Sequence, residues 1–507
     1  MVGLDACSIS TEESDDTGQV ARMEAPVRAD TARGLRGVLV PLALAQFICS
    51  FAGSNMNVMI NDISTDLNTS VQGVQVAITL FLLVMAALMI PGGKLTDRYG
   101  RKRCFLAGLI IYGIGALLSA VSPGLGILIL GNSIFEGVGT ALLIPPVYIL
   151  TTLLFKEMTS RAKAFGIISA LGGIGAAAGP LLGGLITSAI SWRAAFGFQA
   201  LIIVVIVLLS LRIKDPVAPD PTREFDTGGA VLSAVGLVLL VLGILATDNN
   251  LWLALGLVVL GALVLMWFVF ATRRKERAGR EPLVSLSLFR NRTSNLGMVT
   301  QNAQWLLLSG VSFVVSAYLQ VVRGFDAIET GVIFSATTLG LMVSSLAAAR
   351  LARRTSQRNL ILGGFVLTIV GVALLLVMAS GSATPWSFVP GLLLIGVGLG
   401  TMLTPSVNVV QSSFPDQQQG EISGVSRSVS NLGSSLGTAV AGTILVAGLT
   451  ATPERSYALA LAVLAVIGAA GLIAALGLPR HPEPPPASVA FRCERRRGVS
   501  LAAPQRR

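Results

Sequence analysis

The sequence predicts an all-α polytopic membrane protein with fourteen transmembrane helices, built as two six-helix bundles plus two inserted helices. Three observations predict this fold: the composition, the spacing of long apolar segments and an internal repeat. The chain has 507 residues, of which 53% are hydrophobic and 12% are charged, and its mean hydropathy is +0.75. Soluble domains carry about 25% charged residues. The composition therefore excludes a soluble enzyme, a disordered chain and a disulfide-rich secreted domain.

Long apolar segments account for most of the chain. A helix needs about 20 apolar residues to cross a hydrocarbon core of about 30 Å. Fourteen segments satisfy that length, and we number them spans one to fourteen in chain order. They lie at residues 38–61, 72–92, 104–121, 125–150, 164–188, 194–213, 228–246, 251–271, 295–320, 329–349, 360–380, 388–410, 424–449 and 456–478.

The basic residues mark one end of these spans. An even number of spans puts both termini on one side, and 34 of the 37 Lys and Arg fall on that side. Only Arg193, Arg323 and Arg455 fall on the opposite side. The positive-inside rule then predicts a multi-pass cell-membrane protein with both termini in the cytoplasm. The net charge of +11 follows from this topology, so we expect no nucleic-acid partner.

An internal repeat relates the two halves of the chain. Gly175, Gly179 and Gly184 recur as Gly433, Gly437 and Gly442, at an offset of 258 residues. Segments 93–108 and 137–146 recur as 349–364 and 396–405, at offsets of 256 and 259. Parallel six-span repeats around a central cavity are typical of one large class of secondary transporters.

The repeat predicts five parts of the chain. Residues 1–37 and 479–507 form disordered cytoplasmic tails. Residues 38–213 and 295–478 form the two six-helix bundles, and residues 214–294 hold the two inserted helices with their flanking loops. The four cysteines are scattered and the single histidine, His481, lies in a Pro-rich tail, so we expect no metal site and no cofactor.

Two motifs carry a family resemblance. The loop after span two reads Gly93-Lys-Leu-Thr-Asp97-Arg98-Tyr-Gly100-Arg101-Lys-Arg103, and span five contains Gly175, Gly179, Pro180, Gly183 and Gly184. The loop is similar to the signature of the major facilitator superfamily, and span five resembles the motif associated with its antiporters. From about residue 38 to 478 the chain resembles the fourteen-span drug:proton antiporter branch. The resemblance implies a secondary transporter, not an enzyme.

The loop signature implies a conformational latch. A carboxylate at a helix end beside arginines forms charge-assisted hydrogen bonds, and such a cluster locks one of two arrangements. In the family this loop is expected to latch the cytoplasmic side of the outward-facing state. Asp97 and Arg101 would carry that role here beside Arg98, with Gly93 and Gly100 permitting close approach. The alternative is that the basic residues only set orientation.

Span five predicts close helix packing. Glycines four residues apart leave a groove for a neighbouring backbone, and Pro180 removes a helical hydrogen bond. We therefore do not expect the span-five residues to bind ligand.

Glu136 is the candidate for proton coupling. It lies about eleven residues into span four, on the order of 17 Å from the outer end, where an ionised carboxylate is costly. Asn132 lies one helical turn earlier and is expected to hydrogen-bond with it. The family usually carries arginine and glutamine at these two positions, and Ala52 stands where its span-one aspartate would be. Glu136 would therefore replace the usual coupling residues, or else it is a structural carboxyl.

Polar side chains on the first helix of each half predict the wall of a cavity. In span one, positions at 100° per residue put a polar stripe within about 100° of arc. The stripe includes Gln46, Ser50, Ser54, Asn57 and Asn61, and span nine contributes Gln301, Trp305, Ser312 and Ser316. Such a stripe faces protein or a water-filled cavity, because lipid-facing positions do not carry it. For each residue, interhelical hydrogen bonding is the alternative to ligand contact.

The leading functional prediction is proton-coupled efflux of drugs or other amphipathic organic compounds by alternating access. The partners would be a small organic substrate, protons and the lipid bilayer, and we expect a monomer. We place no fixed cation in the cavity, so cationic and neutral lipophilic substrates remain open. The alternatives are a proton symporter that imports a small organic solute and a non-transporting membrane sensor. An ATP-driven exporter is disfavoured because no Walker A loop occurs in the sequence.

Overall fold

The protein is described here by a computed structural model covering residues 37–155, 157–213, 215, 219–220, 225–246, 250–351, 354–379, 384–414, 418–448 and 452–479. Except for Gly37 and Pro479, the two predicted tails lie outside these residues, as does Arg353 in the second copy of the loop motif. Below, "inner" denotes the helix ends that carry the basic loops and "outer" denotes the opposite ends.

The prediction of fourteen spans in an all-helical fold is confirmed, and the described residues contain no strand. In the first half, span one is Gly37–Asp66 and ends in η1 (Met56–Met59) and α2 (Ile60–Asp66); it is followed by α3 (Val71–Tyr99), α4 (Arg101–Ala120), α5 (Leu125–Leu128), η2 (Ile129–Glu136), α6 (Gly137–Leu154), α7 (Met158–Ala189) and α8 (Trp192–Ser210). The insert contains α9 (Thr227–Leu245), α10 (Leu251–Arg277) and η3 (Leu286–Arg290). The second half contains α11 (Arg292–Ala317), η4 (Tyr318–Val322), α12 (Ala327–Leu351), α13 (Gln357–Ala379), η5 (Pro385–Phe388), α14 (Val389–Gln411), α15 (Gln419–Ala447) and α16 (Pro453–Leu476).

Side-chain caps begin several of these helices. Ser70 accepts from the Gly73 N–H at the start of α3, and Asn250 accepts from the Trp252 and Leu253 N–H groups at the start of α10. Such caps satisfy backbone donors that have no partner within the helix. The helix starts are therefore set locally by the sequence.

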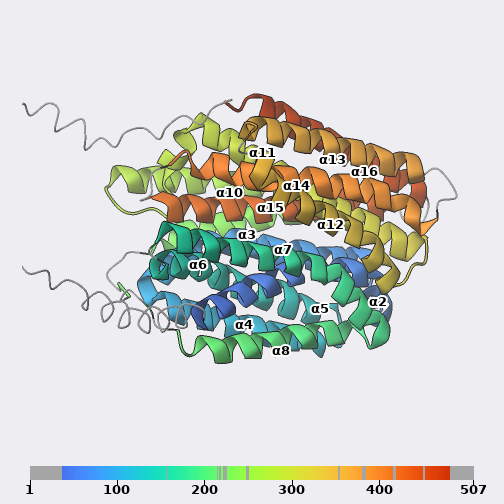
Figure 1. The fold of residues 1–507 in the computed structure, drawn as a ribbon, viewed down its shortest axis with the longest axis horizontal. Helices are drawn as coiled ribbons and strands as arrows, with labels where there is room; N and C mark the ends of the chain where they lie inside the picture. The colour runs from blue at the N-terminus through green and yellow to red at the C-terminus, as the bar shows by residue number, and fades with distance from the viewer. Residues whose placement is uncertain are drawn as a thin grey trace, which may run out of the picture.

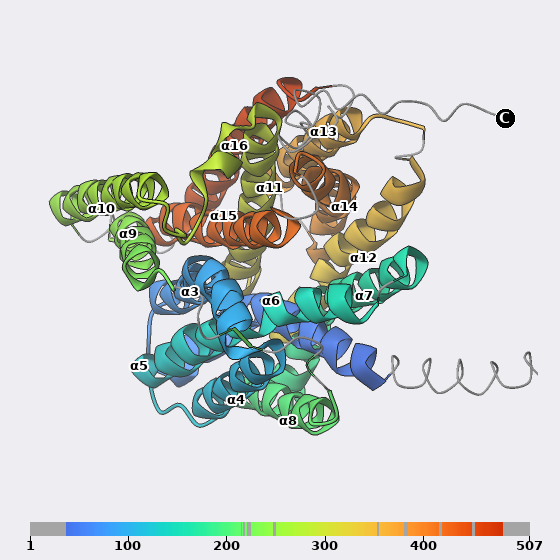
Figure 2. The same cartoon turned by 90° about the vertical axis from the view of Figure 1, so that its left-hand side faces the viewer.

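Two seams join the halves. The helices of the first half pack mainly on one another, as do α11–α16, and contact between the two groups is concentrated along α3 with α15 and α7 with α12 (Figures 1 and 2). The internal repeat relates these seams, because α3 corresponds to α12 and α7 to α15. The division at residues 214 and 294 stays a prediction.

The inserted helices cover one seam. Helix α9 packs on α10 and also on both α3 and α15 (Figure 2). Leu83 of α3, Val241 and Leu245 of α9, and Ala439 of α15 share one apolar cluster. Helix α10 exposes large apolar side chains such as Leu263. That surface suits contact with lipid, as expected for a multi-pass membrane protein.

Candidate functional site

Span one and span nine are hydrogen-bonded at their outer ends. The Gln320 Nε2 donates to the carbonyl oxygen of Asn57 at 2.7 Å, and the Gln320 Oε1 accepts from the Asn61 N–H at 3.1 Å. Gln320 lies in η4 and is buried. One amide side chain of the second half therefore binds two backbone groups of the first half.

Helices α7 and α12 meet backbone to backbone in the outer half of the molecule. A Cβ atom at Gly184 would overlap the carbonyl of Ala327, and one at Gly331 would overlap the carbonyl of Pro180. The Ile328 N–H also donates to the Ser188 Oγ at 3.2 Å. Together with Gln320, these contacts join the two halves at the outer side.

The remaining span-five glycines face span one. Gly175 abuts the carbonyl of Phe47, and Gly179 abuts Ser54. A Cβ atom at Gly183 would lie 3.1 Å from the Asn55 Cβ. Glycines of helix α7 therefore allow close contact both with span one and with the second half.

Helices α3 and α15 meet through a buried amide. The Gln75 Nε2 donates to the carbonyls of Thr438 and Ala439, both at 3.1 Å, and to the Thr443 Oγ1 at 3.3 Å. Farther along the seam the Ser435 Oγ donates to the carbonyl of Thr79 at 3.1 Å. Hydrogen bonds between the halves thus run along this seam.

The expectation of a cavity without a fixed cation is wrong. Helix α15 begins at Gln419, so Arg427 lies two turns inside the helix. Its guanidinium donates to the hydroxyl of Tyr148, which belongs to α6 of the other half. The Tyr148 hydroxyl donates to the Gln46 Oε1 at 3.2 Å, and the Gln46 Nε2 donates to the Ser50 Oγ at 3.2 Å. The predicted Gln46 and Ser50 therefore lie in a polar cluster with Arg427.

The other predicted cavity residues have varied surroundings. The Ser54 Oγ donates to the carbonyl of Ala176 on α7 at 3.1 Å. Gln301 donates to the Ser430 Oγ at 2.9 Å and accepts from the Ser426 Oγ at 2.8 Å, all within the second half. Trp305 and Ser312 are half-buried, and Ser316 is buried. Ser54 and Gln301 therefore make the interhelical hydrogen bonds considered as the alternative to ligand contact.

Glu136 is fully buried inside the first half. It ends η2, a π-helical stretch of span four, and its carboxyl faces the hydroxyls of Tyr112 and Ser119 on α4. Gly115 of α4 packs against the backbone nitrogen of Glu136. Among the described residues no cation forms an ion pair with Glu136. The carboxyl thus points into the first bundle and away from the second half.

The expected hydrogen bond between Asn132 and Glu136 is not formed. The Asn132 Nδ2 and both carboxyl oxygens of Glu136 are buried without a hydrogen-bond partner among the described residues. The π-helical turn explains this, because its i→i+5 pattern is wider than an α-helical turn. Residues four apart therefore do not lie one above the other in this stretch.

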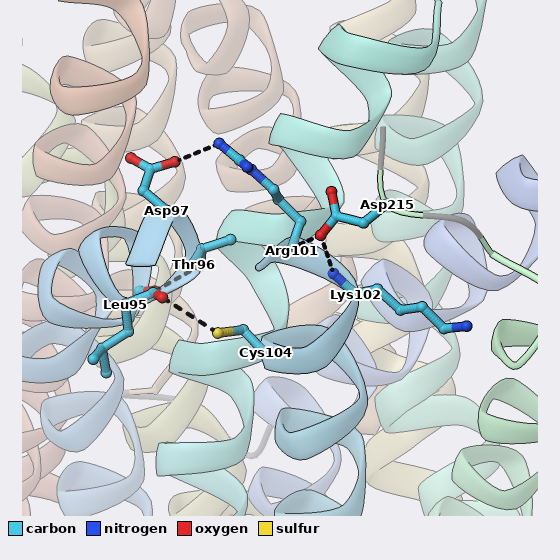
Figure 3. A network of polar contacts seen from close by, with 8 residues as sticks. Leu95, Thr96, Asp97, Arg101, Lys102, Cys104 and Asp215 are labelled. Atoms are coloured by element: carbon cyan, nitrogen blue, oxygen red, sulfur yellow. Dashed lines mark hydrogen bonds and ion pairs between the residues drawn. The ribbon is translucent and has the colours of Figure 1, made fainter. Parts of the chain in front are cut away.

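The predicted latch residues lie at the inner end of α3 (Figure 3). Arg101 and Asp97 form an ion pair at 3.0 Å, with 12% and 28% of their side chains exposed. Gly100 has φ of +96°, a backbone conformation that favours glycine. Arg98 lies over the ring of Tyr99, at 5.6 Å. A Cβ at Gly93 would make only ordinary contact with Pro145, so close approach does not require glycine there.

Asp215 also contacts the predicted latch residues, although the sequence did not single it out. Its Oδ2 accepts from the backbone N–H of Arg101 at 2.6 Å and of Lys102 at 3.2 Å (Figure 3). A carboxylate at a helix N-terminus satisfies free N–H groups and complements the helix dipole. The sequence signal is an acidic residue just after span six, but nothing in the sequence pairs it with α4.

The fold and these interfaces define a membrane transport protein with two pseudo-symmetric halves. The chain belongs to the Major Facilitator Superfamily, whose sequence profile matches residues 42–272 and 227–438. Puromycin resistance protein pur8 of Streptomyces alboniger is 31% identical over 80% of this chain and 81% of its own length. The probable actinorhodin transporter of Streptomyces coelicolor is 30% identical over 77% of this chain and 69% of its own length.

Multidrug resistance protein Stp of Mycobacterium tuberculosis is 26% identical over 82% of this chain and 77% of its own length. Among solved structures, the peptide transporter POT in complex with sulfate has a TM-score of 0.64 and 18% identity, covering 90% of this chain and 95% of its own. This last likeness concerns the fold alone.

Proposed function

We propose that the protein is a secondary transporter that exports drugs or other amphipathic organic compounds in exchange for protons. The similarity to two resistance proteins and a probable actinorhodin transporter over most of the chain carries this proposal. Membership of the superfamily supports transport and the absence of enzyme activity. The termini would lie in the cytoplasm of the cell-membrane protein, because the basic residues mark that side.

Alternating access would proceed by rocking of the two halves. The described state is closed at the outer side by Gln320 and by the contact of Gly184 with Ala327. Opening of the outer side would break these contacts and separate α7 from α12. The latch around Asp97 and Arg101 would then hold the inner side while the outer side is open.

Glu136 would carry the proton. Burying an ionised carboxylate without a cation costs several kcal/mol, so the outer-closed state favours the protonated carboxyl. Protons that enter from outside would thereby drive the return to this state. Because Glu136 faces α4, it would act on the substrate path through span four, which also carries Tyr148.

Purified protein in proteoliposomes tests the proposal. A fluorescent drug loaded on the inner side should be expelled faster when the outside is made acidic, and collapse of the gradient by an ionophore should abolish the acceleration. Inward accumulation driven by outside acid would instead establish a symporter. Specific drug binding without any flux would favour a sensor.

A further inference from the structure

Arg427 is a cation held deep between the two halves. It lies eight residues after Gln419, about 12 Å along α15 from the inner end at 1.5 Å per residue. Tyr148 lies six residues before the end of α6, about 9 Å from that end. Both residues therefore lie within segments that are long and apolar enough to cross a membrane, Glu421–Ala447 and Leu125–Leu154.

Most N–H groups of the Arg427 guanidinium have no acceptor among the described residues. Arginine carries five N–H groups, and among the described residues its one acceptor is the Tyr148 hydroxyl. Arg427 is half-buried and forms no ion pair with a carboxylate of the described chain. Charged side chains at membrane depth are costly and normally pair or mark a substrate path. Glu136, on the same span as Tyr148, faces α4 of the first half.

Aromatic rings adjoin this cation. The Arg427 guanidinium carbon lies 5.0 Å from the centre of the Tyr148 ring. The Tyr148 ring in turn stacks on Phe165 of α7, with centroids 6.0 Å apart and planes at 18°. Gln46 and Ser50 extend the polar side of the cluster. The cluster thus combines a planar cation, flat apolar surfaces and neutral hydrogen-bonding groups from four spans.

We propose that Arg427 and Tyr148 form a substrate subsite for planar aromatic compounds that carry an anionic oxygen, a carboxylate or a phenolate. The anionic oxygen accepts from the free N–H groups of Arg427, and a charge-assisted bond of this kind is stronger than a neutral one. The aromatic body of the substrate stacks beside Tyr148 and Phe165. The inference rests on the proposed export of organic compounds and names the class of compound at that site.

Equilibrium binding in detergent at one pH tests the subsite without any gradient. Fluorescence anisotropy would give the Kd of 5-carboxyfluorescein, an aromatic anion, and of ethidium, an aromatic cation. R427Q should raise the Kd of carboxyfluorescein at least tenfold and leave that of ethidium unchanged or lower. R427K should give an intermediate value, and R350Q, at an exposed inner arginine, should have no effect.

Tyr148→Phe provides a second variant with the ring retained. It removes the hydroxyl that competes with the anion for Arg427, so the Kd of carboxyfluorescein should stay the same or fall. The proposal is overturned by wild-type protein that binds ethidium but not carboxyfluorescein, by an unchanged carboxyfluorescein Kd in R427Q, or by equal weakening of both dyes. Loss of proton-driven export with these Kd differences intact would reject the proposed coupling and leave the subsite standing.

Discussion

The side-chain amide of Gln75 donates to the carbonyl of Thr438 at 3.1 Å, and this bond joins α3 to α15 across the two halves. By the internal repeat, Gln75 corresponds to Gly331 and Thr438 to Pro180, at offsets of 256 and 258 residues. In the other seam Gly331 abuts the carbonyl of Pro180 and supplies no side chain. The equivalent positions are therefore joined by a side-chain hydrogen bond in one seam and by close backbone contact in the other.

This asymmetry predicts that the seam between α3 and α15 stays closed while the seam between α7 and α12 opens. Helix α9 also spans α3 and α15 and adds to the difference. Spin labels on a cysteine-free background test this by pulsed electron resonance. The distance between labels at Ala189 and Val332 should lengthen when the outer side opens, and that between Gln72 and Ala447 should change less. Equal changes would contradict the prediction.

Gly184→Val should prevent closure of the outer side. The added side chain would collide with the Ala327 carbonyl, a backbone atom with little freedom to move. We expect at least a tenfold loss of transport rate, with protein at normal levels in the membrane. Gly173→Val is the matched control, because a Cβ at Gly173 of the same helix meets nothing within 4 Å. Similar activities of the two variants would refute this role of Gly184.

Asp215→Ala should loosen the start of α4. The carboxylate accepts from two N–H groups there, and loss of such a cap costs about 0.5–2 kcal/mol. Thermal unfolding in detergent should show a lower Tm. Glu157→Ala is the control, because Glu157 precedes α7 without a side-chain cap bond. An unchanged Tm for Asp215→Ala would show that the cap contributes little.

The ion pair of Asp226 with Lys275 predicts an acid-sensitive contact within the insert. Burial alone would raise the pKa of Asp226, but bonds from Lys275 and from the N–H groups of Gly229 and Leu283 lower it below the ordinary value. A carboxyl with a lowered pKa in the folded state stabilises it above the unfolded pKa of about 3.9. That stability is lost as the pH falls further, through the folded pKa.

Acidification from pH 5 to 3.5 should therefore lower the Tm of the wild-type protein more than that of Asp226→Asn. At pH 6 the variant should be less stable by about 1–3 kcal/mol, because buried donors lose a charged acceptor. Identical dependence of Tm on pH in the two proteins would exclude Asp226 as the cause.

Hydropathy and charge were sufficient to predict the fourteen spans, because each span must satisfy its own backbone in lipid. Ends shifted by up to seven residues, as at α3, where polar residues continue the helix beyond the apolar segment. Arg427 already lies in the predicted span thirteen, but hydropathy does not reveal that it contacts Tyr148 of the other half. Helix ends beyond the hydrocarbon core leave little trace in hydropathy.

The site was less predictable because it depends on contacts between distant spans. Gln75 and Gln320 are single amides in apolar stretches, and the sequence does not reveal that their partners lie in the other half. Asn132 and Glu136 were paired by α-helical spacing, which the π-helical turn of span four does not follow. The local sequence pattern shows which residue types are present, but the packed structure decides which of them contact one another.

The central claim, that Glu136 couples proton movement to export, is tested most directly by Glu136→Gln in proteoliposomes. The neutral amide keeps the shape of the side chain and removes the titrating group. We predict that the variant still exchanges labelled for unlabelled substrate across the membrane but accumulates at least tenfold less against its gradient when a pH gradient is imposed. Glu157→Gln, at an exposed position, should behave as wild type. Full proton-driven accumulation by Glu136→Gln would contradict the account.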